Sequence, residues 1–254
     1  MKAAKCLIIF LLIAKYGSSQ TIINAERLSD GADSTIYSFV LSYNGTKGNS
    51  NTDQFDISPN VVLLREKNDY KLFGGYSLLS ESGNRILNTG FVHIRHNFKL
   101  TGRIKTFEFY QIQFNKVLLL TKREVFGAGL RFSLLNNDNL KFDFGTGVMR
   151  EVEVLNKTFL LPDELSETKY YRITCVNTIS WIVGKIVKIH NVLYYQPYLN
   201  DFNDYRLLDD FNFIVSITEH FELLTSLTTR YDSKPPGKLN NLDNVISFGF
   251  NVKF

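Results

Sequence analysis

Cysteine and proline are scarce in this chain of 254 residues, which contains 2 Cys and 5 Pro. Cys6 lies in an N-terminal segment that we expect to be removed, so Cys175 is the single thiol of the mature sequence. Neither an intramolecular disulfide nor a thiolate metal cluster can then form. Cys175 alternates in phase with Tyr171, Ile173 and Ile179, which indicates a small apolar residue of a strand rather than a nucleophile.

Net charge and histidine are also low. The formal charge is +4, and three of the lysines lie in the N-terminal segment, so the mature chain is nearly neutral. This balance argues against nucleic-acid binding. The histidines are His93, His96, His190 and His220, and none is spaced with carboxylates on a common face as metal ligands are. Because no local signature of nucleophilic catalysis is present either, we predict no metal, no cofactor and no catalytic residue.

Long apolar runs are missing after the N-terminus. There, Lys2 and Lys5 precede the apolar run CLIIFLLIA and the small residues GSS. This order is typical of a secretory signal peptide, and the run is shorter than the ~20 residues of a spanning helix. We therefore predict a cleaved signal peptide over residues 1–19 and a polar periplasmic leader over residues 20–33. An exported chain without a spanning helix is periplasmic, secreted or an outer-membrane barrel.

Helical periodicity is nearly absent, and apolar residues recur with period two instead. In the last segment, Ile246, Phe248 and Phe250 lie on one side and Ser247 and Gly249 on the other. The one stretch of helical character is PDELSET at residues 162–168. The alternation elsewhere predicts about twelve strands, over residues 36–44, 55–63, 70–80, 86–98, 103–115, 122–135, 140–154, 170–182, 186–198, 205–218, 221–232 and 242–254.

The connections between these segments alternate in length. Short turns near Glu66, Thr101, Asn136, Val183 and Glu219 interleave with longer polar segments after Asn44, Ser80, Asn115, Val154, Leu199 and Asp232. Such alternation is typical of a transmembrane barrel with short periplasmic turns and long outer loops. Backbone groups in hydrocarbon must all be paired, so we expect the last strand, residues 246–254, to pair with the first, residues 37–43. The fold prediction is an all-β, antiparallel transmembrane β-barrel of about twelve strands over residues 34–254, in the bacterial outer membrane.

Charged residues gather on the face opposite the apolar one. A barrel of this size has an interior that side chains can fill or leave as a narrow pore. Two interpretations follow: a lumen that binds or selects anions, or a salt-bridged interior that stiffens the barrel. The predicted lumen-facing residues are Lys71, Arg95, Arg123, Arg131, Lys141, Asp143, Arg172, Lys188, His190, Glu222 and Arg230.

Two further features concern assembly and local irregularity. The terminal residues Phe250, Val252 and Phe254 are typical of the signal by which the barrel assembly machinery recognises its substrates, so this machinery and outer-membrane lipid are the expected partners. Glu108 has the parity of its apolar neighbours, which predicts a β-bulge near Phe109 that turns Glu108 inward, or a place for it at the rim.

Three segments resemble a known family. They are KREVFGAGLRFSL (Lys122–Leu134), the preceding FEFYQIQFNK, and LTTRYDSKPPGKLNNLDNVISFGFNVKF (Leu227–Phe254). These segments are similar to the YdiY-like family of salt-induced outer-membrane proteins, a domain family of unknown function. The resemblance implies an outer-membrane β-barrel and, through the name of the family, a link to osmotic conditions. It implies no catalytic residues.

The predicted function is that of a porin-like outer-membrane barrel, either a narrow pore or a structural barrel linked to envelope or osmotic stress. One alternative is an outer-membrane barrel enzyme that acts on lipid or peptide. Another is a soluble periplasmic barrel that binds an apolar ligand, which requires the apolar faces of the strands to line the cavity.

Overall fold

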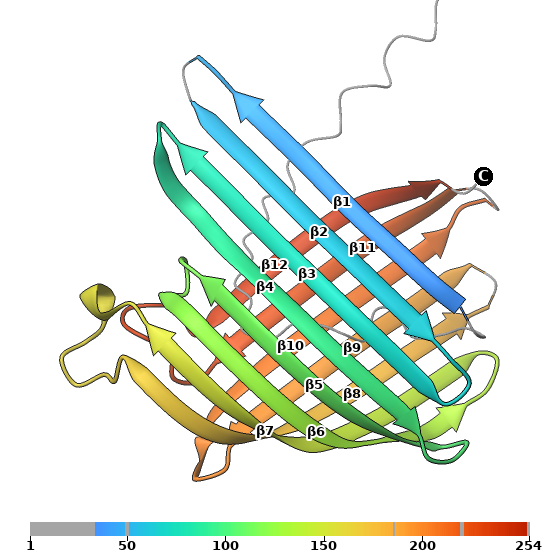
Figure 1. Ribbon diagram of the computed structural model, residues 1–254. Coiled ribbons are helices and arrows are strands. Elements are labelled where there is room, and N and C mark those ends of the chain that lie inside the picture. Colours follow the sequence, from blue (N-terminus) through green and yellow to red (C-terminus); the bar gives the residue numbers. More distant parts are fainter. Residues whose placement is uncertain (1–33, 49–50, 185, 219–220, 253–254) are drawn as a thin grey trace, which may run out of the picture.

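Twelve antiparallel strands form one sheet in which each strand is hydrogen-bonded to its neighbours in sequence order (Figure 1). The computed structural model describes residues 34–48, 51–184, 186–218 and 221–252. The signal peptide and leader predicted for residues 1–33, and the terminal Phe254, lie outside this part of the chain. The prediction of an all-β fold with about twelve antiparallel strands is confirmed.

The strands are longer than most of the predicted segments, because the polar residues at their ends also join the ladders. Their bounds are β1 Ser34–Thr46, β2 Thr52–Leu64, β3 Asn68–Glu81, β4 Asn84–Lys99, β5 Ile104–Asn115, β6 Leu120–Asn136, β7 Leu140–Leu155, β8 Glu167–Val183, β9 Val187–Tyr198, β10 Asp201–Ser216, β11 Phe221–Asp232 and β12 Leu242–Val252.

Helical structure within residues 34–48, 51–184, 186–218 and 221–252 is limited to one short 3-10 turn, η1 (Lys157–Phe159). The Asn156 side chain caps it by accepting a hydrogen bond from the amide of Thr158. The helical character considered for residues 162–168 is wrong, because the Glu164 carboxylate binds backbone amides of the loop and β8 already begins at Glu167. No helix of the described residues is long and apolar enough to cross a membrane.

The two ends of the sheet differ in their connections. At the end that we call the turn end, residues 65–67, 100–103 and 137–139 link the strands, and at the opposite loop end residues 116–119, 156–166 and 233–241 do so. The longer segments predicted after Ser80 and Leu199 are wrong, since β3–β4 and β9–β10 are joined by two residues each. Ser82 and Gly83 both have positive φ, 49° and 82°, as a tight hairpin turn requires.

The expected pairing of the first strand with the last is also not found. In the part of the chain that the structure describes, β1 pairs only with β2, and β12 pairs only with β11. The inward positions at these edges include Ser38 and Ser42 but also Ile36 and Val40 on β1, and Ser247 and Gly249 on β12. The sheet curls, but its two edges do not pair within the described residues.

Apolar side chains cover the outside of the curled sheet. Phe248 and Phe250 of β12 are 76% and 70% exposed, and Phe126 of β6 is 60% exposed. In the interior, by contrast, Val176 and Leu208 belong to a buried apolar cluster contributed by β8, β9 and β10. The strand parity that placed the apolar residues on one face therefore describes an outward-facing surface.

Candidate functional site

The predicted lumen charges fall into four groups along the interior. Two groups lie at the turn end: Lys71, Arg131, Lys141 and Asp143 on β3, β6 and β7, and Lys188, His190 and Glu222 on β9 and β11. The third group, in the middle, consists of Arg95, Arg123 and Arg172. Arg230 faces the loop end.

Glu151 of β7 is the centre of the middle group and is completely buried. It accepts hydrogen bonds from Arg123 Nε at 2.6 Å, from Arg172 Nε at 2.7 Å and from Arg206 Nη1 at 2.8 Å. These arginines come from β6, β8 and β10. One carboxylate thus joins strands that are not all neighbours in the sheet, and it does so through charge-assisted bonds.

Further carboxylates neutralise the same arginines. Arg206 binds both oxygens of Glu153, at 2.8 and 2.9 Å, and its Nε donates to Asp232 at 2.9 Å. Arg172 contacts Asp204 at 2.8 Å. Three arginines therefore meet four carboxylates, and each of these charges has an ion-pair partner, which is the condition under which buried charges are tolerated.

Little space remains directly beside the network, whereas a separate cavity of about 210 Å³ is lined by residues of β1 to β4. Beside the network, the cavity lined by Arg95, Phe107, Met149 and Tyr194 measures only about 30 Å³. The guanidinium of Arg95 lies over the Phe107 ring, 4.8 Å from its centroid, and Nδ1 of His93 donates a hydrogen bond to Oε1 of Gln111 at 3.0 Å. A volume of this size accommodates about one water molecule.

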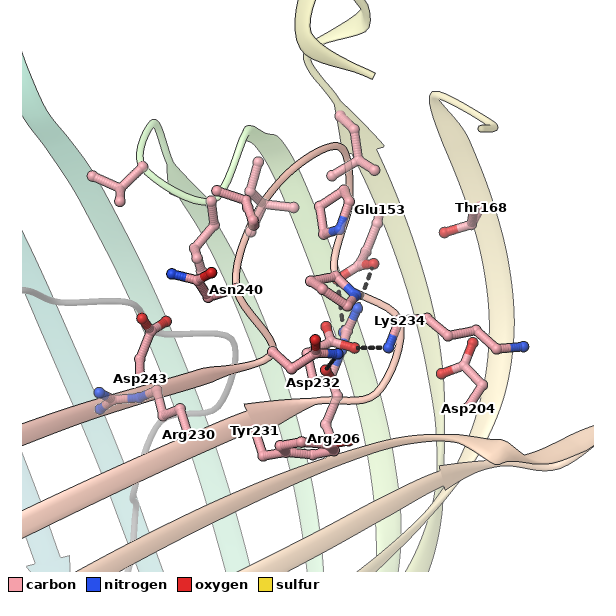
Figure 2. A pocket seen from close by; sticks show the side chains of 18 of the residues that line it. Glu153, Thr168, Asp204, Arg206, Arg230, Tyr231, Asp232, Lys234, Asn240 and Asp243 are labelled. Atoms are coloured by element: carbon pink, nitrogen blue, oxygen red, sulfur yellow. Dashed lines mark hydrogen bonds and ion pairs between the residues drawn. The ribbon is translucent and has the colours of Figure 1, made fainter. Parts of the chain in front are cut away.

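A much larger vestibule of about 930 Å³ opens above the network at the loop end. Figure 2 shows Arg206 with Glu153 and Asp232 in this vestibule, beneath the β11–β12 loop. Lys234 of that loop binds Asp201 at 2.6 Å, and this hydrogen bond raises the pKa of the lysine. The vestibule is large enough for a small solute, but its floor is the ion-pair network.

The two long loops are joined over this vestibule. Gly237 of the β11–β12 loop donates its backbone amide to both oxygens of Glu164 in the β7–β8 loop, at 3.0 and 2.9 Å. Gly237 has a φ of 63°, and a β-carbon there would lie 2.6 Å from the carbonyl oxygen of Phe159. Only glycine meets both conditions, so the sequence KPPG specifies this contact.

Replacing Gly237 with alanine is expected to separate these loops. Left-handed backbone costs a residue with a β-carbon about 1 to 2 kcal/mol, and the clash with Phe159 adds to this. Limited digestion with subtilisin should cut the β7–β8 or β11–β12 loop several-fold faster than in the parent protein. Asn240→Ala, an exposed change in the same loop, is the control and should leave the rate unchanged. Equal rates for Gly237→Ala and Asn240→Ala would contradict this role.

The outer surface near the turn end holds a polar cluster. His96 contacts Glu108 at 2.9 Å and Asn68 at 2.9 Å, and its ring stacks on Tyr70. β5 pairs with β4 without a register shift, and with β6 it shifts only between Gln113 and Asn115. The β-bulge predicted near Phe109 is therefore wrong: Glu108 keeps its outward parity because His96 provides a partner there.

Sequence reasoning missed the carboxylates that balance the interior. Glu151 and Glu153 share the parity of Asp143 on β7, and Asp204 shares that of Arg206 on β10. Extending the parity count along each whole strand would have placed these residues inside. The partnerships, in contrast, depend on which strands face each other across the interior, and no local signal records this.

The candidate metal ligands and nucleophiles in the described part of the chain are its His, Cys, Asp and Glu residues and Ser180. No group of three His, Cys, Asp or Glu residues there is placed to hold a metal ion. The Ser180 hydroxyl lies 2.9 Å from Nδ1 of His190. Cys175 contacts the Thr146 hydroxyl at 3.6 Å.

Comparison with known proteins identifies a family for this chain. No curated protein matches the sequence. Among solved structures, one described as "NanC porin structure in rhombohedral crystal form" is similar over 79% of this chain and 94% of that chain, with a TM-score of 0.47 and 11% identity. The model of a family described as "Protein of unknown function, DUF481" matches residues 40–254, in agreement with the resemblance to the YdiY-like proteins. The chain therefore belongs to the DUF481 family.

Proposed function

We propose that the protein is a bacterial outer-membrane β-barrel whose interior is closed at mid-height, so that it acts as a structural barrel with a solute-sized outer vestibule and not as an open pore. The observation that carries this proposal is the buried network around Glu151, beside which only about 30 Å³ of space remains. A hydrated ion or small solute requires far more room than that.

The outer surface supports the membrane location. Large apolar side chains such as Phe248, Phe250 and Phe126 lie exposed on the outside of the sheet. Exposed apolar surface of this kind suits the hydrocarbon of a bilayer, in which strands of about 9 to 11 residues suffice to cross. The alternative of a soluble barrel with an apolar cavity required these faces to point inward, and they point outward.

Energetics explain why the network should hold the interior shut. Each buried charge has lost its water, and only its protein partners compensate for that loss. Moving Arg206 aside, for example, breaks its bonds to Glu151, Glu153 and Asp232 together. The free-energy cost of moving one such side chain is therefore high, and we expect the lumen to open only rarely.

Export, assembly and stress response complete the proposal. The signal peptide over residues 1–19 would direct export, and the terminal Phe250, Val252 and Phe254 would present the chain to the barrel assembly machinery. The resemblance to salt-induced proteins supports a role of the barrel under osmotic or envelope stress. An enzymatic role on lipid or peptide has no described residue cluster in its favour.

Two measurements on the same preparation test the proposal. The protein from fractionated membranes is first run in SDS with and without boiling, and it should occur in the outer membrane and migrate faster unboiled. The folded form is then added to a planar bilayer, where we expect no resolvable single-channel steps. Soluble protein without a heat shift would contradict the membrane location, and regular conductance steps would contradict the closed interior.

A further inference from the structure

A second cavity lies at the turn end, opposite the loop-end vestibule. Its volume is about 230 Å³, and inward residues of β3 to β7 line it together with Gly102 and Arg103 of the β4–β5 turn. It shares no lining residue with the loop-end vestibule. We call it the turn-end cavity; nothing in the proposed function uses it.

The floor of the turn-end cavity is built from buried polar groups. Lys71 is 2% exposed and Asn97 is 7% exposed. The carbonyl oxygen of the Asn97 side chain accepts a hydrogen bond from Arg95 Nε at 2.9 Å, which leaves its amide hydrogens as the groups that can face the cavity. Arg131, whose side chain is 11% exposed, forms the wall and contacts Asp143 at 2.9 Å.

The charge of the cavity lining is strongly unbalanced. Six cationic side chains line it but only two carboxylates, Asp69 and Asp143. Asp143 contacts Arg131, and Asp69 lies 3.6 Å from Lys105. The positive charges lining this small cavity therefore outnumber the negative ones by four. The six cations are Lys71, Lys99, Arg103, Lys105, Arg131 and Lys141.

We propose that the turn-end cavity is a binding site for a small multivalent anion carrying phosphate groups, of about the size of a diphosphate. Converging cations in a partly enclosed space focus a positive potential that attracts such an anion. Lysine binds phosphate as a point charge and arginine through its planar donors, and Lys71 and Arg131 supply both kinds at the floor and wall. The volume excludes a larger organic ligand.

The phosphate groups can come from two sources at this place. The turn end would face the periplasm in the proposed orientation, where a soluble diphosphate can enter, and the head group of an inner-leaflet phospholipid lies near the same rim. The chemistry of recognition is shared, since both sources present phosphate oxygens to the same cations. The site itself does not depend on whether the middle of the barrel is closed.

Isothermal titration of the folded full-length barrel with sodium diphosphate, in a neutral detergent at low salt, tests the site. We expect saturable binding that weakens as salt is raised. Lys71→Met combined with Arg131→Gln should lower the affinity at least tenfold. Lys234→Gln, which removes an exposed lysine at the loop end, is the matched control and should bind as the parent does.

A second variant covers the case in which the buried changes prevent folding. Lys99→Gln combined with Lys105→Gln alters only the rim, and it should fold, as judged by the heat shift in SDS, while weakening diphosphate binding several-fold. No saturable binding by the parent protein would overturn the site. Equal affinity of the parent and of a folded turn-end variant would overturn it as well.

Lipid nanodiscs distinguish the two sources of phosphate. Diphosphate affinity is compared between nanodiscs of neutral phosphatidylcholine and nanodiscs containing anionic phosphatidylglycerol. If diphosphate binds more weakly in the anionic nanodiscs, a lipid head group is supported as the occupant. In this comparison Lys234→Gln should bind diphosphate as the parent protein does in both kinds of nanodisc. Equal affinity in both nanodiscs supports a soluble anion. The proposal fails if diphosphate binds in neither.

Discussion

Glu151→Gln is expected to destabilise the folded barrel by about 3 to 5 kcal/mol, the largest effect that we predict for a single substitution. The amide has nearly the shape of the carboxylate, so the loss is electrostatic. Arg123, Arg172 and Arg206 would remain buried while the charge that all three contact is removed. Glu153 contacts Arg123 and Arg206, and Asp204 contacts Arg172, so Glu151 is the carboxylate that joins all three.

The free energy of unfolding is measured by urea titration of the refolded protein in liposomes, followed by the heat-shifted band in SDS. Glu167→Gln is the matched control, because Glu167 starts the next strand, is exposed and forms an exposed ion pair with Lys169. That control should unfold at the same urea concentration as the parent protein. If Glu151→Gln unfolds at the same urea concentration as Glu167→Gln, the network does not hold the interior.

Phe248→Arg is expected to cost about 2 to 4 kcal/mol, provided that Phe248 faces the middle of the bilayer. Phe248 lies near the centre of β12, opposite Thr225 of β11, and is 76% exposed on the outer face. An arginine there must either leave its charge in hydrocarbon or pull water and head groups toward it, and both are unfavourable.

The same urea titration in liposomes measures this effect, and Phe248→Leu is the control. Leucine keeps the apolar contact with lipid, so it should stay within about 1 kcal/mol of the parent protein. A soluble barrel would give a different result, since arginine at an exposed site in water costs little. Equal stabilities of the arginine and leucine variants would therefore contradict the membrane location.

Alternation along the sequence was sufficient to predict the strands. The range of β11, Phe221–Asp232, was predicted to the residue, and the other strands differ mainly by added polar residues at their ends. The reason is physical: in β4 to β9 one face contacts the packed interior and the other forms the outer surface, which enforces period two, whereas β1 has no buried residue. Polar ends carry no such signal, which is why their extension was missed.

The arrangement of the interior could be predicted only in part. Parity placed Arg123 and Arg172 on the inner face, but it could not show that Glu151 would join them to Arg206 across 55 residues of sequence. Such contacts depend on the curvature of the whole sheet. The short β3–β4 turn was missed for a local reason: Ser82 adopts a positive φ, which is uncommon for serine and cannot be predicted from its residue type.

The free edges of β1 and β12 make the shape of this sheet dependent on its solvent. Backbone amides and carbonyls along both edges can be hydrated in water, but hydrocarbon leaves them without partners at a cost of several kcal/mol per group. A bilayer therefore favours any arrangement in which the two edges meet. In thermodynamic terms the lipid acts as a ligand for the closed form, so insertion and closure of the seam are linked equilibria, and each strengthens the other.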